Sequence, residues 1–256
     1  ADVQQKNVTS LMKMHHALLL MASLFLVGGM KSRALQEKEN STAKVIIFHR
    51  VDPQKDNLRL FWKNEEEEPY GNIGKLKEQL ASKGKELVFA MNAGMFTAEQ
   101  KPLGLYIEDG TPLVDLNRGK SSYGNFYLLP NGIFYVTEEK QAAVEKTQNF
   151  SQRDDILFAT QSGPMLLLDG KIHSKFKDGS ANVNIRNGVG ILPDGSILFG
   201  VSREPVNFFD FATAFREKGC KNALYLDGVI CKTYLPEKGL NQLGGKLGPL
   251  IGVVRE

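Results

Sequence analysis

Two short stretches of the chain place a polar side chain directly after an apolar run and directly before small residues. In FAMNAGMF, Asn92 precedes Ala93 and Gly94, and in LYLDGVI, Asp227 precedes Gly228. A carboxylate in such a place can attack an electron-poor centre or stabilise developing positive charge, and an amide can bind a ligand beside it. Ordinary turns explain both stretches equally well, because Asp-Gly and Asn-containing turns are common.

Two further stretches contain polar side chains that interrupt apolar runs. In FATQSGPMLLLDGK, the residues Gln161, Ser162 and Gly163 separate two strand-like runs, as either a bulge or a loop that faces a substrate would do. In NIRNGVGIL, Arg186 precedes a glycine-spaced strand. A lone arginine is commonly a surface ion-pair partner, but its guanidinium is also well shaped to grip a phosphate or carboxylate at two points.

Two amphipathic helices are expected in the chain. Apolar residues recur at helical spacing between Asn72, a predicted N-cap, and Gly84, a predicted stop. The same arrangement recurs between Asn207 and Gly219. These two segments are the elements that must position the polar residues after them.

Each predicted helix is followed by an apolar run that ends eight positions after the stop glycine, at Asn92 in one case and at Asp227 in the other. Such a run is typical of a strand buried inside a sheet. In α/β proteins, ligands bind in the crevice outside the carboxyl ends of strands, where glycines allow close approach. The two similar units therefore predict that Asn92, Gly94, Asp227 and Gly228 lie where a site is usually built.

The remaining strands are predicted to form hairpins. Turn signals at 108–110, 130–132 and 193–195 each separate two strand-like runs. We therefore expect an α/β, mixed α+β fold with antiparallel or mixed sheets, frequent hairpins, two amphipathic helices and a cleft lined by the motifs. Strands are expected at 44–48, 58–62, 126–129, 133–136 and 250–254.

Composition indicates a globular protein and gives no support to a nucleic-acid partner. The chain has 256 residues, 42% of them hydrophobic, which is enough for a packed core. The formal net charge of +3 is small and its charges are scattered, so no nucleic acid is expected to bind. The sequence does not indicate an oligomeric state.

The N-terminal segment has the features of an export signal. Residues 17–30 form an apolar run of fourteen residues after a short segment that contains Lys13. The run is shorter than the roughly 20 residues of a membrane-spanning helix and has the length of a secretory signal. We expect residues 1–42 to contain an N-terminal extension, then a signal peptide or uncleaved membrane anchor, and then a tether. A domain is expected at 43–256. A periplasmic or secreted location is expected.

The cysteines and histidines give no metal-binding pattern. Cys220 and Cys231 could pair in an exported protein or remain buried thiols. His49 and His173 lie far apart in the chain, so a zinc site is not expected. No cofactor is predicted, although a divalent cation that bridges Asp227 to a substrate phosphate stays an open alternative.

Four motifs in series resemble a known family. NAGMF, QSGPMLLLDGK, IRNGVGILPDG and LYLDG, in this order and at these separations, are similar to the phosphodiester glycosidase family, which includes the enzyme that uncovers mannose 6-phosphate on lysosomal proteins. The chain resembles most the bacterial YigE-type members, which are exported proteins. The similarity extends from about Val45 to the C-terminus, and it implies a mixed α/β domain with a cleft lined by these motifs.

The resemblance implies cleavage of a sugar whose anomeric carbon is linked to a phosphodiester. Such a reaction passes through an oxocarbenium-like state that a carboxylate can stabilise or attack, and Asp227 is expected to play that role. Arg186 is expected to stabilise the departing phosphate. The predicted substrate-binding groups are Asn92, Gly94, Gln161, Ser162, Gly163 and Gly228.

Two departures from the family pattern leave alternatives open. Many members have a second glycine and serines after Asp-Gly, where this chain has Val229, Ile230 and Cys231, and Asn187 stands where threonine is frequent. A bulkier loop there could narrow the cleft. The alternatives are a different hydrolase of envelope glycan phosphodiesters and a non-catalytic protein that binds an anionic glycan.

Overall fold

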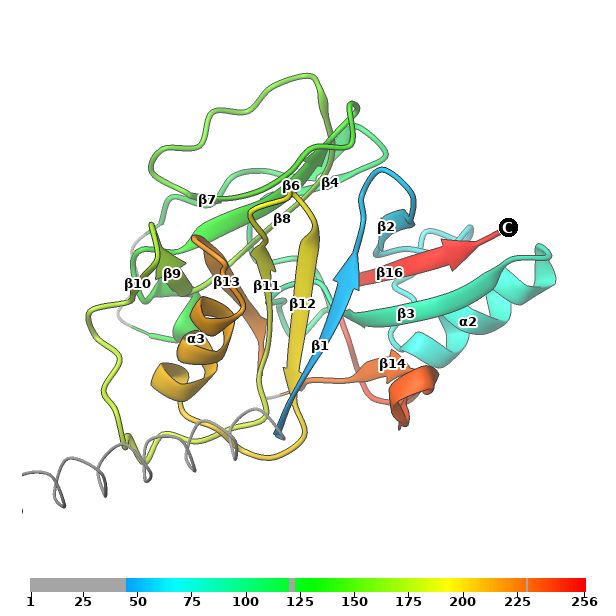
Figure 1. Cartoon of the computed structure of the whole chain (residues 1–256). Helices are drawn as coiled ribbons and strands as arrows, with labels where there is room; N and C mark the ends of the chain where they lie inside the picture. Colours follow the sequence, from blue (N-terminus) through cyan, green and yellow to red (C-terminus); the bar gives the residue numbers. More distant parts are fainter. Residues whose placement is uncertain (1–44, 120–122, 229) are drawn as a thin grey trace, which may run out of the picture. The chain divides into compact units, whose positions relative to one another are not determined.

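The computed structural model describes residues 45–119, 123–228 and 230–256. The predicted leader and tether lie outside the described residues. The strands form one six-stranded sheet, in the order β1-β12-β11-β13-β9-β10, and two five-stranded sheets, in the orders β15-β14-β3-β16-β2 and β5-β4-β8-β6-β7 (Figure 1). We call these the first, second and third sheets.

The elements have the following bounds. The first sheet contains β1 (Ile46–Val51), β9 (Met165–Leu168), β10 (Lys171–Ile172), β11 (Asn187–Ile191), β12 (Ile197–Ser202) and β13 (Ala223–Asp227). The second contains β2 (Asn57–Phe61), β3 (Glu86–Asn92), β14 (Thr233–Leu235), β15 (Leu240–Asn241) and β16 (Leu250–Arg255). The third contains β4 (Tyr106–Glu108), β5 (Thr111–Val114), β6 (Gly132–Thr137), β7 (Ala142–Lys146) and β8 (Ile156–Ser162). The helices are α2 (Ile73–Ser82) and α3 (Phe208–Glu217), with 3₁₀ turns at Asn125–Tyr127 and Pro236–Lys238.

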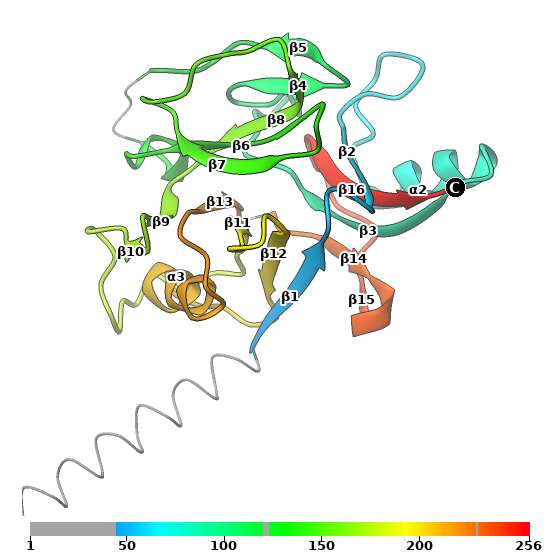
Figure 2. The ribbon, with the colours of Figure 1, turned by 45° about the horizontal axis from the view of Figure 1, so that its top comes forward.

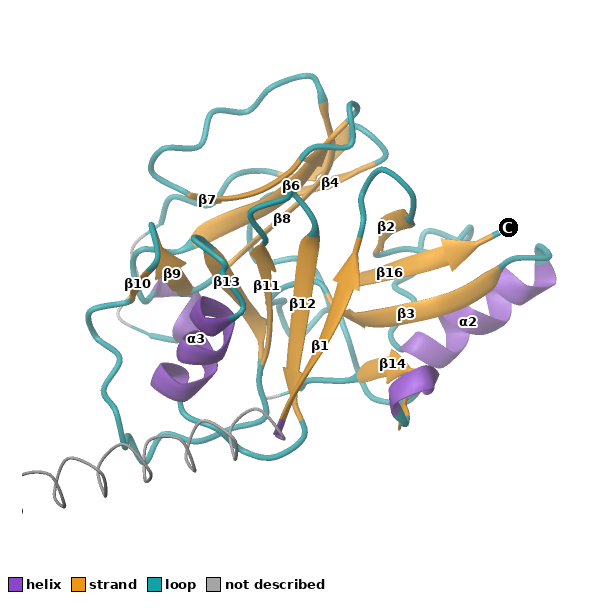
Figure 3. Cartoon of the chain, in the orientation of Figure 1, coloured by secondary structure: helices purple, strands orange, loops and turns teal. Residues whose placement is uncertain are grey.

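Both predicted helices are confirmed, with their caps. The side chain of Asn72 accepts a hydrogen bond from the backbone N–H of Lys75, and Asn207 accepts one from Asp210. Gly84 follows α2 in the left-handed region, at φ 73°. Figure 3 shows that these helices are a small part of a molecule built mainly of strands, so the predicted mixed α+β class holds with a larger share of β-structure.

The two helix-strand units have the same topology. In the second sheet, β2 and β3 are each paired antiparallel with β16, so they run parallel to each other with β16 between them, and α2 connects them. In the first sheet, β12 and β13 are likewise each antiparallel to β11, and α3 connects them. Each unit is therefore a βαβ crossover into which an antiparallel strand is inserted. The insertion explains why all strand pairings among the described residues are antiparallel, as one of the two predicted sheet types requires.

Apolar side chains from all three sheets meet in one core. This core includes Phe89 of the second sheet, Phe134 of the third sheet and Phe199 of the first, with ring centroids of Phe89 and Phe199 5.1 Å apart. Figure 2 shows the third sheet above the other two. Helix α3 covers the outer face of the first sheet and α2 that of the second, each through its apolar stripe. The core therefore holds β3 and β13, which carry the candidate site residues, in fixed positions.

One predicted strand, at 126–129, is wrong. The segment instead contains a 3₁₀ turn at Asn125–Tyr127. The amide of Asn131 donates a hydrogen bond of 3.1 Å to the carbonyl of Phe126, and such local side-chain bonds compete with strand pairing. The predicted hairpin turns at 108–110 and 193–195 are confirmed, since they connect β4 to β5 and β11 to β12.

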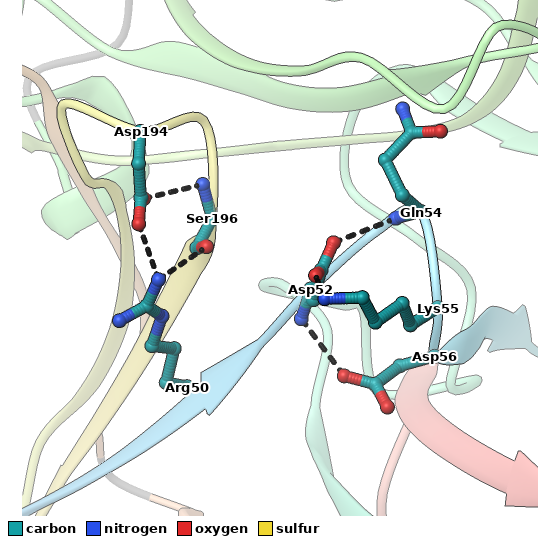
Figure 4. Close-up of polar contacts among 7 residues, drawn as sticks. All are labelled: Arg50, Asp52, Gln54, Lys55, Asp56, Asp194 and Ser196. Carbon is teal, nitrogen blue, oxygen red and sulfur yellow. Dashed lines mark hydrogen bonds and ion pairs between the residues drawn. The ribbon is translucent and has the colours of Figure 1, made fainter.

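Polar contacts fix the turns around β1. Arg50 on β1 pairs with Asp194 in the β11–β12 turn and donates a hydrogen bond of 3.1 Å to the hydroxyl of Ser196 (Figure 4). The turn after β1 is closed by the Asp52 carboxylate, which accepts from the backbone N–H of Gln54 at 3.0 Å. These exposed contacts define the hairpin ends at the edge of the first sheet.

A partly buried carboxyl group gives the fold a pH-dependent stability. The hydroxyl of Tyr106 donates to the Glu108 carboxylate at 2.9 Å. Burial raises the pKa of Glu108 from 4.5 to about 7, and the hydrogen bond from Tyr106 opposes this rise. Because the pKa is raised in the folded state, the stabilising contribution is complete below pH 4.5 and is lost as the pH rises through about 7.

We therefore expect Glu108→Gln to be more stable than the wild type at alkaline pH, by roughly 2 kcal/mol. The glutamine keeps an acceptor for Tyr106 and removes the buried charge. Urea unfolding at pH values on both sides of the shifted pKa measures the effect. A variant whose stability falls with pH as steeply as that of the wild type would contradict it.

Candidate active site

The two polar residues that end β3 and β13 meet. The side-chain amide of Asn92 donates a hydrogen bond of 3.3 Å to a carboxylate oxygen of Asp227. Asn92 is fully buried, whereas 8% of Asp227 is exposed. The similar units of the second and first sheets therefore bring their last residues together, although 135 positions separate them in the chain.

Backbone groups hold the Asp227 carboxylate in one orientation. Its second oxygen accepts a hydrogen bond of 2.6 Å from the backbone N–H of Gly228. The side chain of Asn187 accepts from the backbone N–H of Asp227 at 2.7 Å and donates to the carbonyl of Asn92 at 3.4 Å. Asn187, which departs from the family pattern, thus joins both strand ends.

The amide of Asn92 also bonds to the backbone of Ile230 and Lys232. Its nitrogen donates to the carbonyl of Ile230 at 2.8 Å, and its oxygen accepts from the backbone N–H of Lys232 at 2.9 Å. The amide oxygen and nitrogen are thus both bonded within the protein. Asn92 is therefore placed to orient Asp227 and the adjoining segment, more than to bind a ligand itself.

Asp227 lines a small cavity with an aromatic wall. The cavity has a volume of about 220 Å³, and one wall is the 123–127 segment, which contains Tyr123, Phe126 and Tyr127. We call it the aromatic cavity; its other lining residues are Met95, Phe96, Leu103, Gly124, Asn125, Asp227 and Ile230. Aromatic faces next to one carboxylate suit a small ligand with an apolar ring face and polar edges.

Gln161 and Ser162 are brought near the site but have bonds within the protein. The Gln161 amide accepts from the N–H groups of Leu105 and Asn117 at 3.0 and 2.9 Å, and donates to the Asn117 carbonyl at 2.7 Å. Its side chain thus holds two segments together in this structure. The hydroxyl of Ser162 donates to the carbonyl of Leu226 at 2.7 Å, which ties β8 to β13.

The predicted glycines are explained by close packing. A Cβ atom at Gly94 would lie 2.8 Å from the Thr160 hydroxyl oxygen, and one at Gly163 would lie 2.6 Å from the Cβ of Asn131. A Cβ at Gly228 would clash with the hydroxyl of Tyr225. Gly94 therefore lets the end of β3 approach β8, and Gly163 lets the end of β8 approach the segment before β6.

Arg186 is fully buried on the side of the first sheet that α3 covers. Its guanidinium lies 3.6 Å from the ring centroid of Phe208, and it donates to the carbonyls of Val206 at 2.7 Å and Asn182 at 2.9 Å. Its Nη1 has no hydrogen-bond partner within the described residues. Arg186 is absent from the described lining of the aromatic cavity.

The hydroxyl of Tyr225 connects the two regions electrostatically. Burial raises the pKa of Tyr225 well above its usual value, Arg186 lowers this pKa and Asp227 raises it. The Tyr225 hydroxyl therefore lies within the field of both groups. Burial likewise raises the pKa of the Cys231 thiol to about 12, and Asp227 contributes to that rise. Cys220 and Cys231 are both free and buried, so neither is a thiolate nucleophile at neutral pH.

The described part of the chain gives no evidence of a metal centre or a membrane span. Within residues 45–119, 123–228 and 230–256, no three His, Cys, Asp or Glu side chains cluster in a way that could hold a metal ion. No helix in these ranges has the length and apolar character to cross a membrane. The apolar run at 17–30 lies outside them.

The aromatic wall is the part of the site that the sequence analysis missed. The stretch YGNFY, at 123–127, was assigned partly to a strand, although its glycine and asparagine between aromatic residues are equally typical of a loop. Asn187 was noted only as a departure from the family pattern. Its position at the start of β11, paired with Asp227, becomes apparent only from the register of the sheet.

The fold and the paired strand ends define a known class. The profile of the phosphodiester glycosidase family matches residues 85–246, and the chain belongs to this family. It is 38% identical over 186 residues to the protein YigE of Escherichia coli K12, which covers 72% of each chain.

Solved structures share the fold. The zebrafish N-acetylglucosamine-1-phosphodiester alpha-N-acetylglucosaminidase catalytic domain, auto-inhibited by its pro-peptide, is 15% identical, with a TM-score of 0.56 over 82% of each chain. A putative exported protein from Burkholderia pseudomallei is 11% identical, with a TM-score of 0.51 over 81% of this chain and 73% of the other.

Proposed function

We propose that the protein is a hydrolase that cleaves a sugar-1-phosphodiester in the cell envelope. One observation carries this proposal: the Asp227 carboxylate is held at the wall of the aromatic cavity by Asn92 and the N–H of Gly228. Membership of the phosphodiester glycosidase family supports the class of reaction.

The fixed carboxylate supplies the chemistry that breaking the anomeric bond requires. As the bond between the anomeric carbon and the phosphate oxygen lengthens, positive charge develops on the sugar ring, and Asp227 either stabilises that charge or bonds to the carbon. The phosphate monoester leaves with the bonding electrons, and water adds to the anomeric carbon. A phosphate monoester is a good leaving group, so a strong general acid is not needed.

The site residues divide into three roles in this proposal. Asp227 contacts the reacting carbon, while Asn92 and Asn187 position Asp227 and the segment after it. The aromatic wall, with Phe126 and Tyr127, packs against the sugar ring. No metal ion takes part in the proposed reaction, and the protein acts outside the cytoplasm after export by its N-terminal segment.

The position of an isotopic label tests the proposal. The purified protein is incubated with a panel of sugar-1-phosphodiesters in water enriched in heavy oxygen, with and without a chelator. We expect the label in the free sugar, because the proposed reaction breaks the carbon–oxygen bond, and we expect the same rate with the chelator.

Label in the phosphate group would contradict the proposal. It would show attack at phosphorus, which is the reaction of an ordinary phosphodiesterase and would leave a sugar phosphate. Binding of the panel with no turnover of any member would favour a non-catalytic glycan-binding protein. A rate that falls with the chelator would contradict the metal-independent step.

A further inference from the structure

A second, larger cavity lies beside the candidate active site. It has a volume of about 670 Å³ and includes Gly228 and Lys232, which follow Asp227, together with Arg203 after β12 and Gln242 after β15. We call it the basic cavity. Figure 1 shows the segment that leads into β14 passing the C-terminal end of β12, where these elements come together.

The charges in this cavity are of one sign. Arg203 and Lys232 are charged lining residues, and no aspartate or glutamate appears among the described lining residues. No salt bridge to either cation is present in the part of the chain that the structure describes. Asn184, Ser202 and Gln242 add neutral polar groups to the wall. Two like charges that share a hollow repel each other, and a bound anion relieves this repulsion through charge-assisted hydrogen bonds.

Hydrogen bonds hold the backbone of Lys232 and the side chain of Arg203. The backbone N–H of Lys232 donates to the Asn92 side chain, which also holds Asp227. The guanidinium of Arg203 donates to the backbone carbonyl of Lys238. Both residues are therefore anchored by a hydrogen bond at the cavity wall.

One segment separates the two cavities. Asp227 and Ile230 line the aromatic cavity, whereas Gly228, Cys231 and Lys232 line the basic cavity. The aromatic cavity is smaller than the roughly 300 Å³ at which sites for larger organic ligands begin, and the basic cavity falls within their range. A ligand with a compact uncharged end and a larger anionic end matches this pair of cavities.

We propose that the basic cavity binds the phosphate-bearing leaving group of the substrate, with Lys232 and Arg203 as its anion ligands. This inference rests on the proposed function, because it assigns the sugar to the aromatic cavity. Among sugar-1-phosphodiesters, the basic cavity would favour substrates whose phosphate carries a bulky group over those whose phosphate carries a small alkyl group.

Binding of glucose 6-phosphate, a phosphate monoester that carries a bulky group, tests the inference without any need for turnover. Calorimetric titration is carried out on the wild type, Lys232→Gln, Arg203→Gln and a matched control, Lys140→Gln, which removes one exposed lysine from the β6–β7 turn. We expect each of the first two variants to bind about tenfold more weakly, and the control to bind within about twofold of the wild type. Added salt should weaken binding to the wild type.

Two outcomes would overturn the inference. One is that Lys232→Gln, Arg203→Gln and the control Lys140→Gln bind equally well. The other is that a wild-type protein that turns over its substrate shows no detectable binding. Asp227→Asn separates the inference from the proposed function. Binding that depends on Lys232 and persists in Asp227→Asn, together with no turnover by the wild type, supports the anion site and contradicts the hydrolase. The thermal midpoint of each variant identifies any loss that comes from unfolding.

Discussion

Asp227→Asn is expected to lower kcat for a sugar-1-phosphodiester by roughly a thousandfold. The substitution removes the negative charge that would stabilise or attack the anomeric centre. It keeps an oxygen that can accept from the N–H of Gly228, which the carboxylate now does at 2.6 Å. The new amide would face the amide of Asn92, which retains its bond to the Ile230 carbonyl. We therefore expect a folded variant with a small loss of stability.

The measurement is steady-state turnover with circular dichroism on the same samples. Asp109→Asn is the matched control, because it removes one exposed carboxylate from the β4–β5 turn, where Asp109 pairs with Arg59. The control should turn over within about twofold of the wild type, since surface charges far from a site have little effect. If Asp227→Asn remained as active as the control, Asp227 would have no catalytic role.

Arg186→Lys is expected to lower the free energy of unfolding by about 3 kcal/mol. Arg186 is fully buried, donates to the carbonyls of Val206 and Asn182, and lies over the ring of Phe208. A lysine keeps the charge but can neither reach both carbonyls in the same geometry nor stack on the ring. Two backbone acceptors would lose their donor, and a buried charge would lose its partners.

Urea unfolding measures this loss, with Arg153→Lys as the matched control. Arg153 forms an exposed pair with Asp155 at 3.0 Å, and its replacement should cost less than about 0.5 kcal/mol. Equal stability of the two variants would contradict the structural role of Arg186. If Arg186→Lys were stable and lost only turnover, the role in phosphate stabilisation that the sequence suggests would be favoured.

Local signals in the sequence were sufficient for the parts of the fold in which neighbouring residues decide the structure. Asn72 and Asn207 cap their helices because each accepts a hydrogen bond from the residue three positions ahead. The strand ends at Asn92 and Asp227 followed from the repeat of helix, stop glycine and apolar run. The family resemblance added the order of the motifs.

Long-range register decides the parts that the sequence did not predict. A strand at 126–129 failed because Asn131 bonds back to Phe126, which removes a backbone acceptor from pairing. Gln161 stays a predicted substrate-binding residue, but the sequence did not predict that its amide bonds to Asn117, 44 positions away. Such a partner cannot be predicted from neighbouring residues, because the local sequence around a polar residue at a strand end does not depend on whether its side chain faces a ligand or another segment.

The Asn92–Asp227 contact joins residues of two different sheets, and this has a consequence for how the protein fails. A slight slip of one layer past the other would part donor from acceptor while both layers kept all of their internal pairing. Under mild heat or denaturant, such a molecule would retain its far-ultraviolet circular dichroism signal but would already have lost its activity. If Asp227 is the catalytic carboxylate, we therefore expect activity to be lost at a lower temperature or denaturant concentration than secondary structure.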